Sequence, residues 1–191
     1  MTPPDDLNAL AEHILGQLSD AVSAPASPWR TPMLASLTAD GEPTLRTVVL
    51  RSVRPADRAL RVNTDIRSDK AGQIDRQRQV ELCFWNPATA QQVRIAGDAR
   101  VEDAGPAADA AWSALPPEGR SIYRHGAAPG TPIGRPGTPA RPAADGDRSA
   151  FALVTVVWRR WDWIWLGPDS HWRARFRWDA DGSRQAEWVV P

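Results

Sequence analysis

The stretch "SHWRARFRW", Ser170–Trp178, decides the fold, because its side chains alternate between two unlike faces. One face is cationic or ionisable: His171, Arg173, Arg175 and Arg177. The other face is apolar: Trp172, Ala174, Phe176 and Trp178. A period of two is typical of a β-strand, whereas a helix repeats its faces every three or four residues. The stretch therefore predicts a sheet with a cationic face near the C-terminus, and Arg177 is expected to be a solvated strand end.

Strand-like segments separated by turn residues run through most of the chain. They cover residues 31–38, 44–53, 59–64, 80–86, 91–103, 151–160, 161–167, 171–178 and 186–191. Asp40-Gly41 marks a hairpin turn, and the first three segments are expected to form an antiparallel meander. If seven or eight of these nine segments form separate strands, their spacing and the few helices predict a mainly β (α+β) fold built as a small antiparallel barrel.

The first helix is expected over residues 5–22. Apolar side chains recur there at spacings of three and four: Leu7, Leu10, Ile14, Leu18 and Val22. Such a pattern is typical of an amphipathic helix that covers a core. Two shorter helices are expected over residues 67–79, with Ser68 as the cap, and over residues 105–116.

The pattern indicates one domain, residues 1–191, with the opening helix in 1–24 and closing strands in 151–191. Residues 126–148 are dense in Gly, Pro and Ala, which predicts a long mobile loop.

The composition narrows the function classes. The 191-residue chain has a formal net charge of zero, so no general attraction to nucleic acid or to an anionic membrane is expected. With Cys83 as its one cysteine and three scattered histidines, it predicts neither a disulfide framework nor a metal site. The N-terminal residues lack a signal-peptide pattern, which favours a cytoplasmic protein.

Two segments could bind an anion. In "NTDIRSDK", residues 63–70, Thr64, Ser68 and Lys70 lie where a strand gives way to a helix start. Free backbone N–H groups, hydroxyls and an ammonium there suit a phosphate, although an ordinary capped helix explains the pattern equally well. In "RTVVLR", residues 46–51, the two arginines point to opposite faces, and a core strand with solvated ends is the simpler interpretation.

Two further segments could bind a flat ligand. Gln92 and Arg94 alternate with apolar residues on one strand, a pattern that a plain surface face also produces. Tryptophans alternate over residues 161–165, and packing over a barrel end is the commoner reason for such a row. No nucleophile–base pair or nucleotide-binding glycine loop is visible, so no catalytic residue is assigned. Any difficult chemistry is expected to come from a cofactor.

Taken in order, four segments resemble the pyridoxamine 5′-phosphate oxidase superfamily of FMN-binding split barrels. They are "DGEPTLRTVVLR", "NTDIRSDKAGQI", "FWNPATAQQVRIAG" and "WLGPDSHWRARF". The resemblance runs from about Pro32 to Pro191, without the 126–148 loop. It implies an FMN-binding split β-barrel with a few peripheral helices, and a homodimer with FMN at the interface.

The resemblance also implies roles for individual residues. Arg46 and Lys70 would hold the FMN phosphate, with Ser68 as a further candidate. The backbone of Val48 and Val49 would run along the isoalloxazine ring.

Four more cofactor contacts follow from the same resemblance. Thr64 and Gln92 would hydrogen-bond the flavin, and Trp165 and Arg175 of the second subunit would complete the pocket.

The substrate side of the pattern departs from the vitamin B6 oxidase. Arg51, His171 and Arg173 would face a small-molecule substrate, but the order of the last two is reversed. Arg51 replaces a lysine, and the oxidase's Tyr … Arg-Pro … Ser phosphate clamp is absent from residues 112–126. The resemblance therefore favours an oxidase-related FMN oxidoreductase. A reductase with a nicotinamide or deazaflavin donor and a flavin carrier or sensor without turnover are the alternatives.

Overall fold

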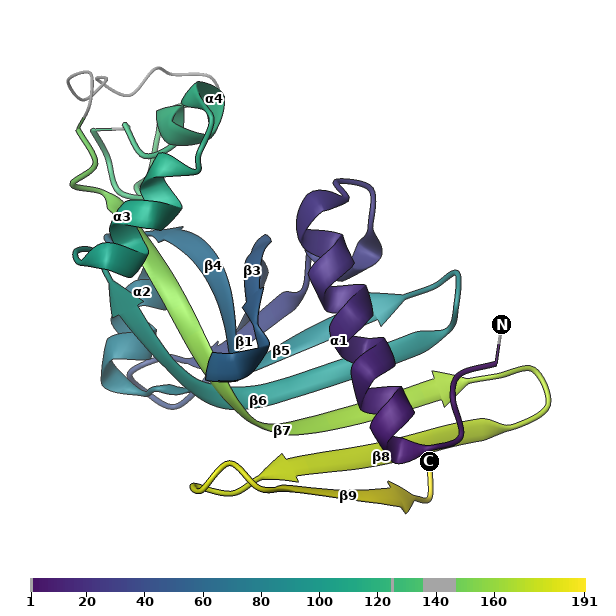
Figure 1. Cartoon of the computed structure of the whole chain (residues 1–191). Helices are drawn as coiled ribbons and strands as arrows, with labels where there is room; N and C mark the ends of the chain where they lie inside the picture. The colour runs from purple at the N-terminus through teal and green to yellow at the C-terminus, as the bar shows by residue number, and fades with distance from the viewer. Residues whose placement is uncertain (1, 125, 136–146) are drawn as a thin grey trace.

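The computed structural model describes residues 2–124, 126–135 and 147–191 (Figure 1). Most of the loop expected at 126–148 therefore lies outside the described residues. The helices are α1 (Leu7–Ser23), α2 (Asp69–Arg76), α3 (Pro106–Ser113) and α4 (Pro117–Ser121), with 3-10 turns at Pro28–Arg30 and Pro55–Asp57. The strands are β1 (Met33–Leu37), β2 (Pro43–Thr47), β3 (Leu50–Arg54), β4 (Ala59–Asp65), β5 (Gln79–Asn86), β6 (Gln91–Glu102), β7 (Phe151–Leu166), β8 (His171–Trp178) and β9 (Arg184–Val189).

The strands form one antiparallel sheet in the order β2-β1-β5-β6-β7-β4-β3, and the β8–β9 hairpin pairs with β7 (Figure 1). The predicted antiparallel fold with few helices is confirmed. The strands curl into an open barrel rather than a closed one, because β2 and β3 end the path without pairing with each other.

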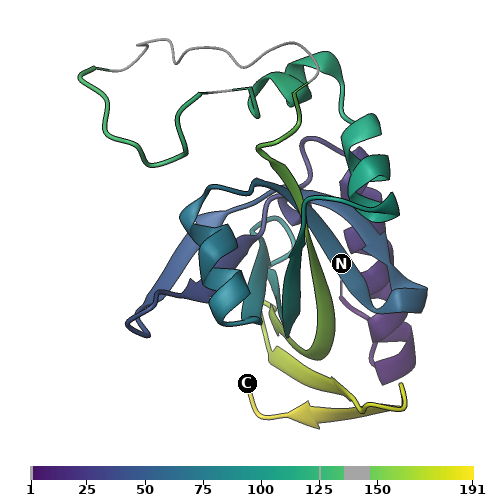
Figure 2. The same ribbon diagram turned by 90° about the vertical axis from the view of Figure 1, so that its left-hand side faces the viewer.

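The sheet has a core face that can be followed across seven strands. Its central row consists of Arg46, Leu34, Leu82, Ile95, Trp161, Phe176 and Ala186, each paired with the next. The side chains from Leu34 to Phe176 are fully buried. α1 adds Leu10, Ile14 and Leu18 to the same core cluster, which explains the spacing of its apolar residues. Figure 2 shows α1 and α2 on opposite flanks of the strands.

A bulge in β7 lets one strand serve two parts of the sheet. Residues 151–157 pair with β4, whereas residues 160–166 pair with β8, and β6 runs beside both parts. The register shifts at Ala96/Gly97, where Arg159 has no partner on β6. Because of the extra residue, Trp158 and Trp161 are both buried although they are three positions apart.

Three details of the expected arrangement were wrong. Residues 44–53 form two strands instead of one, because the chain leaves β2 at Val48 and crosses to β3, so there is no meander of the first three segments. Residues 151–167 form one bulged strand, not two. The expected total of seven or eight strands compares with nine in the described part of the chain, and α4 follows α3 as a separate short helix.

Gly97 provides a test of the bulge. A Cβ atom at this position would lie 2.2 Å from the Val157 carbonyl oxygen, and backbone cannot move aside as a side chain can. We expect Gly97→Ala to lower the free energy of unfolding by roughly 1–3 kcal/mol or more. Urea denaturation measures this change. Gly16→Ala is the control, because a Cβ there meets nothing within 4 Å and should add about 0.5–1 kcal/mol of helix stability. Equal effects of the two substitutions would contradict the bulge geometry.

Candidate functional site

A cavity of about 290 Å³ lies where β2 meets the start of α2. Its lining includes Thr44, Arg46, Ser68, Asp69, Lys70, Gln73, Pro129 and Gly130. The structure thus brings together the three residues that the sequence suggested for a phosphate, Arg46, Ser68 and Lys70. We call this cavity the phosphate cradle.

Arg46 is held by neutral acceptors from three elements. Its Nη1 donates to the Ser36 hydroxyl and to the Leu34 carbonyl oxygen at 3.1 Å. Its Nη2 donates to the Thr44 hydroxyl and to Gln73 Oε1 at 2.9 Å. These bonds fix the guanidinium without neutralising it, and burial lowers the pKa of Arg46 from its ordinary value. Sequence reasoning missed Ser36, Thr44 and Gln73, because only the pairing of β1 with β2 and the packing of α2 bring them to Arg46.

Lys70 provides the second positive charge of the cradle. Its Nζ donates to Ser68 Oγ at 3.3 Å. Burial lowers the pKa of Lys70, and the nearby charge of Arg46 lowers it further, against the opposing effect of Asp65 and Asp69. Two cations that repel each other in a partly buried cavity favour an anion between them.

The start of α2 differs from the expected capping pattern. Ser68 holds the cap position but makes no side-chain cap bond to the helix. Its hydroxyl donates to the Asp65 carbonyl oxygen at 2.6 Å and lies 3.1 Å from the Thr64 hydroxyl. Thr64 is buried, and its hydroxyl is within hydrogen-bond distance of the Ser68 hydroxyl. The first N–H groups of α2 therefore donate no hydrogen bond to the cap side chain.

The second group of predicted residues lies on the face of the sheet opposite the core. One row of this face consists of Thr47, Met33, Cys83, Arg94, Asp162, Arg175 and Glu187. A neighbouring row contains Trp85, Gln92, Ile164 and Arg173. Gln92, Arg173 and Arg175 are thus brought together, but on strands that do not line the phosphate cradle.

Asp162 holds three arginines together. Arg173 binds it with two bonds, Nε to Oδ1 at 2.9 Å and Nη2 to Oδ2 at 2.8 Å. Arg94 donates at 2.9 Å and Arg175 at 3.4 Å to Oδ2. Burial alone would raise the pKa of Asp162, but the bond from Arg173 and the charges of Arg94 and Arg173 hold the pKa below its ordinary value. A lone carboxylate in "WDWIW", opposite an arginine strand, is the sequence signal for this cluster.

The remaining predicted residues lie around these two groups. Trp165 is mostly buried, and its ring centroid lies 5.3 Å from that of Trp172. His171 is exposed and lines a cavity of about 330 Å³ with Arg173. Val48 donates its N–H to the Pro32 carbonyl oxygen, in the two-residue break between β2 and β3.

Val49 completes that break, and the chain then enters β3. Arg51 lies on β3 and lines a separate cavity, away from Arg46.

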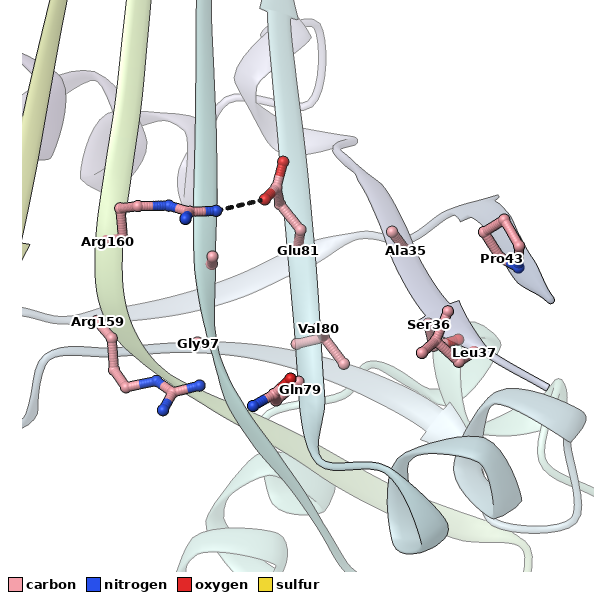
Figure 3. Close-up of a pocket in the computed structure, with 11 residues that line it drawn as sticks. Ala35, Ser36, Leu37, Pro43, Gln79, Val80, Glu81, Gly97, Arg159 and Arg160 are labelled. Atoms are coloured by element: carbon pink, nitrogen blue, oxygen red, sulfur yellow. Dashed lines mark hydrogen bonds and ion pairs between the residues drawn. The ribbon is translucent and has the colours of Figure 1, made fainter. Parts of the chain in front are cut away.

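A further cavity, about 530 Å³, lies over the β7 bulge (Figure 3). Arg159 and Arg160 reach into it, but each already pairs with a carboxylate, Asp98 or Glu81. Within the described ranges, no group of three His, Cys, Asp or Glu side chains could hold a metal ion. Nor does any described helix combine the length and the apolar character needed to cross a membrane.

The fold and the cradle define a class of protein, the antiparallel split barrel, here with a cationic cavity beside α2. Residues 13–103 match the family model described as "Pyridoxamine 5'-phosphate oxidase, FMN-binding domain". This part of the chain therefore resembles the pyridoxamine 5′-phosphate oxidase-related family of FMN-binding split barrels, and the fold of the chain agrees with that resemblance. The family resemblance expected from the sequence is confirmed.

Known proteins show how far the similarity extends. The curated "Pyridoxine/pyridoxamine 5'-phosphate oxidase 2" of Arabidopsis thaliana is 35% identical over 71 residues, or 37% of this chain and 36% of that protein. The chain thus matches little more than a third of that relative's length. A crystal structure of a pyridoxamine 5'-phosphate oxidase-related, FMN binding protein from Nostoc punctiforme PCC 73102 has a TM-score of 0.78 and 26% identity, covering 94% of this chain and 96% of that one. PhzG from Burkholderia lata 383, solved with tetrahydrophenazine-1-carboxylic acid, shares the fold, with a TM-score of 0.74, 18% identity and coverage of 99% and 94%.

Asp162→Asn tests the arginine cluster. Three partly exposed guanidiniums would lose their shared carboxylate, and we expect the free energy of unfolding to fall by about 1–3 kcal/mol at neutral pH. Because the pKa of Asp162 is depressed in the folded state, its contribution is present above the ordinary value and is lost as the pH falls through the lower, folded-state value. The difference between wild type and variant should therefore shrink in acid.

Asp98→Asn is the matched control for this measurement. It removes the exposed partner of Arg159 and should change stability by no more than about 0.5 kcal/mol. Urea denaturation across a pH series gives both values, and a similar loss in the two variants would contradict the special role of Asp162.

Lys70→Met tests the cost of burying a second positive charge beside Arg46. A lysine with a lowered folded-state pKa makes the folded state less stable at any pH where it stays charged. The variant without added ligand should therefore melt at a higher temperature than wild type at neutral pH. The gain should vanish as the pH rises from the lowered pKa to the ordinary value. Arg177→Met, at an exposed strand end, should leave the melting temperature unchanged.

Proposed function

We propose that the protein is an FMN-dependent oxidoreductase that acts as a homodimer on a small anionic molecule. The observation that carries the proposal is the phosphate cradle. Arg46 and Lys70 face one cavity beside a helix start, and among the described residues neither forms an ion pair. An anion would balance these two positive charges together.

The cradle fits the phosphate of FMN in charge and in donor set. Arg46 and Lys70 supply two positive charges, Ser68 a hydroxyl, and α2 its first N–H groups. Arg46 is already oriented by four acceptors, so little side-chain entropy is lost when the phosphate binds. Asp69 at the rim lowers the net charge of the cradle, which tempers the affinity for any free anion.

The flavin ring would extend from the cradle toward residues that the family resemblance assigns to it. Val48 and Val49 would lie along its plane, while Thr64 and Gln92 would bond its polar edge. When bound, FMN would supply hydride transfer through its N5 atom. The protein would bind the substrate, orient it and exclude water.

A second subunit is part of the proposal. The face opposite the core exposes three large apolar side chains, Met33, Leu45 and Trp85, at 38%, 65% and 43%. Apolar groups gathered on one exposed face favour burial against a partner. A homodimer through this face would bring Arg175 of one subunit, and the end of β7 that carries Trp165, to the flavin of the other.

The arginine cluster would serve the cofactor and the substrate in this dimer. Asp162 fixes Arg173 and Arg175 but leaves the group of three arginines with a positive excess. Arg175 would stabilise the negative charge of the reduced flavin. His171 and Arg173, with Arg51 from elsewhere in the fold, would face the substrate.

The oxidoreductase, reductase and carrier hypotheses all require bound FMN, and the colour of the purified protein tests this requirement. We expect visible flavin absorbance, or its appearance after FMN is added, and a mass in solution of two chains. Anaerobic mixing with pyridoxamine 5′-phosphate or NADPH should bleach the flavin bands. Bleaching by NADPH alone would favour the reductase alternative, and bleaching by neither would favour a carrier. A colourless protein that takes up no FMN contradicts the proposal.

Arg46→Ala and Lys70→Met test the cradle assignment. Each removes a charged hydrogen-bond donor and should weaken FMN binding by roughly 1.5–3 kcal/mol, or about ten- to a hundredfold. Quenching of FMN fluorescence on titration with protein measures the affinity. Arg177→Ala serves as the control and should bind FMN like wild type. Wild-type affinity in both cradle variants would show that the phosphate binds elsewhere.

A further inference from the structure

A second cationic cavity lies apart from the phosphate cradle and shares no lining residue with it. Its volume is about 330 Å³, and it lies among β3, β4, the segment before β1 and α3. The polar side chains of its wall are Arg30, Arg51, Ser52, Arg61 and Asn63. Apolar residues such as Ala107, Ala111 and Leu153 form the rest.

The arginines of this cavity are partly buried, and the wall carries three buried polar atoms without a partner among the described residues: Arg51 Nε, Arg61 Nε and Asn63 Oδ1. The Nε atoms of Arg51 and Arg61 are shielded from solvent, and neither has a hydrogen-bond acceptor among the described residues. A guanidinium does not lose its proton at any ordinary pH, so these donors remain unsatisfied. Buried donors without acceptors are costly, and a ligand that supplies acceptors removes the cost.

The charge of the cavity is also unbalanced. Arg30, Arg51 and Arg61 line it, and none of the described lining residues is acidic. Arg30 donates to the Val22 carbonyl oxygen, which orients it without neutralising its charge. The contrast with the Asp162 cluster is direct, because there a carboxylate is shared by three arginines.

We propose that this cavity is a second oxyanion site, in which Arg30, Arg51 and Arg61 bind the phosphate or carboxylate group of a small molecule. The apolar wall from α3 would contact the body of that molecule. The volume lies in the range of small-ligand pockets and far exceeds that of a single water. Arg30 and Arg61 would thus supply the anion anchor that the missing Tyr … Arg-Pro … Ser clamp does not.

The ligand class follows from this chemistry. A guanidinium matches phosphate and carboxylate oxygens equally well, often with two parallel bonds. That the ligand is the substrate rests on the proposed oxidoreductase function, but the binding of the anion does not. An experiment can therefore contradict the identity of the ligand as substrate without contradicting the binding of an anion, and the reverse.

The test is a titration of the purified full-length protein with inorganic phosphate and, separately, with benzoate. Melting temperature and calorimetry report the binding, with and without saturating FMN. Three variants are compared with wild type: Arg61→Gln in the second cavity, Lys70→Met in the cradle and Arg159→Gln at an exposed ion pair outside both. Flavin absorbance is recorded in each.

We expect at least one of the two anions to bind wild type, and its affinity to fall tenfold or more in Arg61→Gln. With FMN saturating the cradle, Lys70→Met and Arg159→Gln should keep that affinity. Tighter binding of phosphate would assign a phosphate ester, and tighter binding of benzoate a carboxylic acid. Loss in Lys70→Met with retention in Arg61→Gln would place the anion in the cradle and overturn the proposal, as would the failure of both probes on wild type. A protein that binds no FMN but passes the Arg61 test would contradict the proposed function alone.

Discussion

The fold depends on one constraint within β7. There, one extra residue shifts the alternation between side chains that face the core and side chains that face away from it. A strand of sixteen residues must pack tryptophans on the core face along both halves while it changes its neighbour from β4 to β8. Strict alternation cannot bury both Trp158 and Trp161, so an extra residue, Arg159, is inserted where the neighbours change. Gly97 on β6 lets the Val157 carbonyl approach at this point. Removal of the bulge would turn either Trp158 and the valines before it, or Trp161, Trp163 and Trp165, toward the opposite face of the sheet.

The same alternation determines on which face of the sheet the charged side chains lie. After the bulge, Trp161, Trp163 and Trp165 face the core, and Asp162 must face away from it. The alternation of β8 sets Arg173 and Arg175 on the same side as Asp162. The carboxylate therefore meets guanidiniums from both neighbouring strands, and the cationic face of "SHWRARFRW" is first of all a partner of β7. Its excess charge is what remains for a ligand.

Local sequence patterns predict the individual helices and strands of this protein better than they predict which elements pair or pack with one another. The alternation in His171–Trp178 and the helical spacing in Leu7–Ser23 each require only one segment, and both elements were predicted correctly. The break at Val48 and Val49 carries no turn residue, so nothing local separates β2 from β3. The acceptors that hold Arg46 come from positions 34, 36, 44 and 73, which only the assembled sheet and α2 bring together. Arg30 and Arg61 were missed for the same reason, since neither belongs to a recognisable motif.

Three groups of arginines show how a chain of zero net charge can still concentrate positive charge locally. Arg46 is bound by neutral oxygens, which fix its position and keep its charge available. Arg94, Arg173 and Arg175 share Asp162, which compensates one charge of three. Arg51 and Arg61 have buried donors that no described acceptor satisfies. Neutral or missing partners leave the charge of an arginine unbalanced, whereas a carboxylate shared by several arginines balances only part of it. Because the interior cannot neutralise a guanidinium by removing its proton, the number of unmatched donors in a cavity indicates, more directly than net charge does, where a negatively charged ligand belongs.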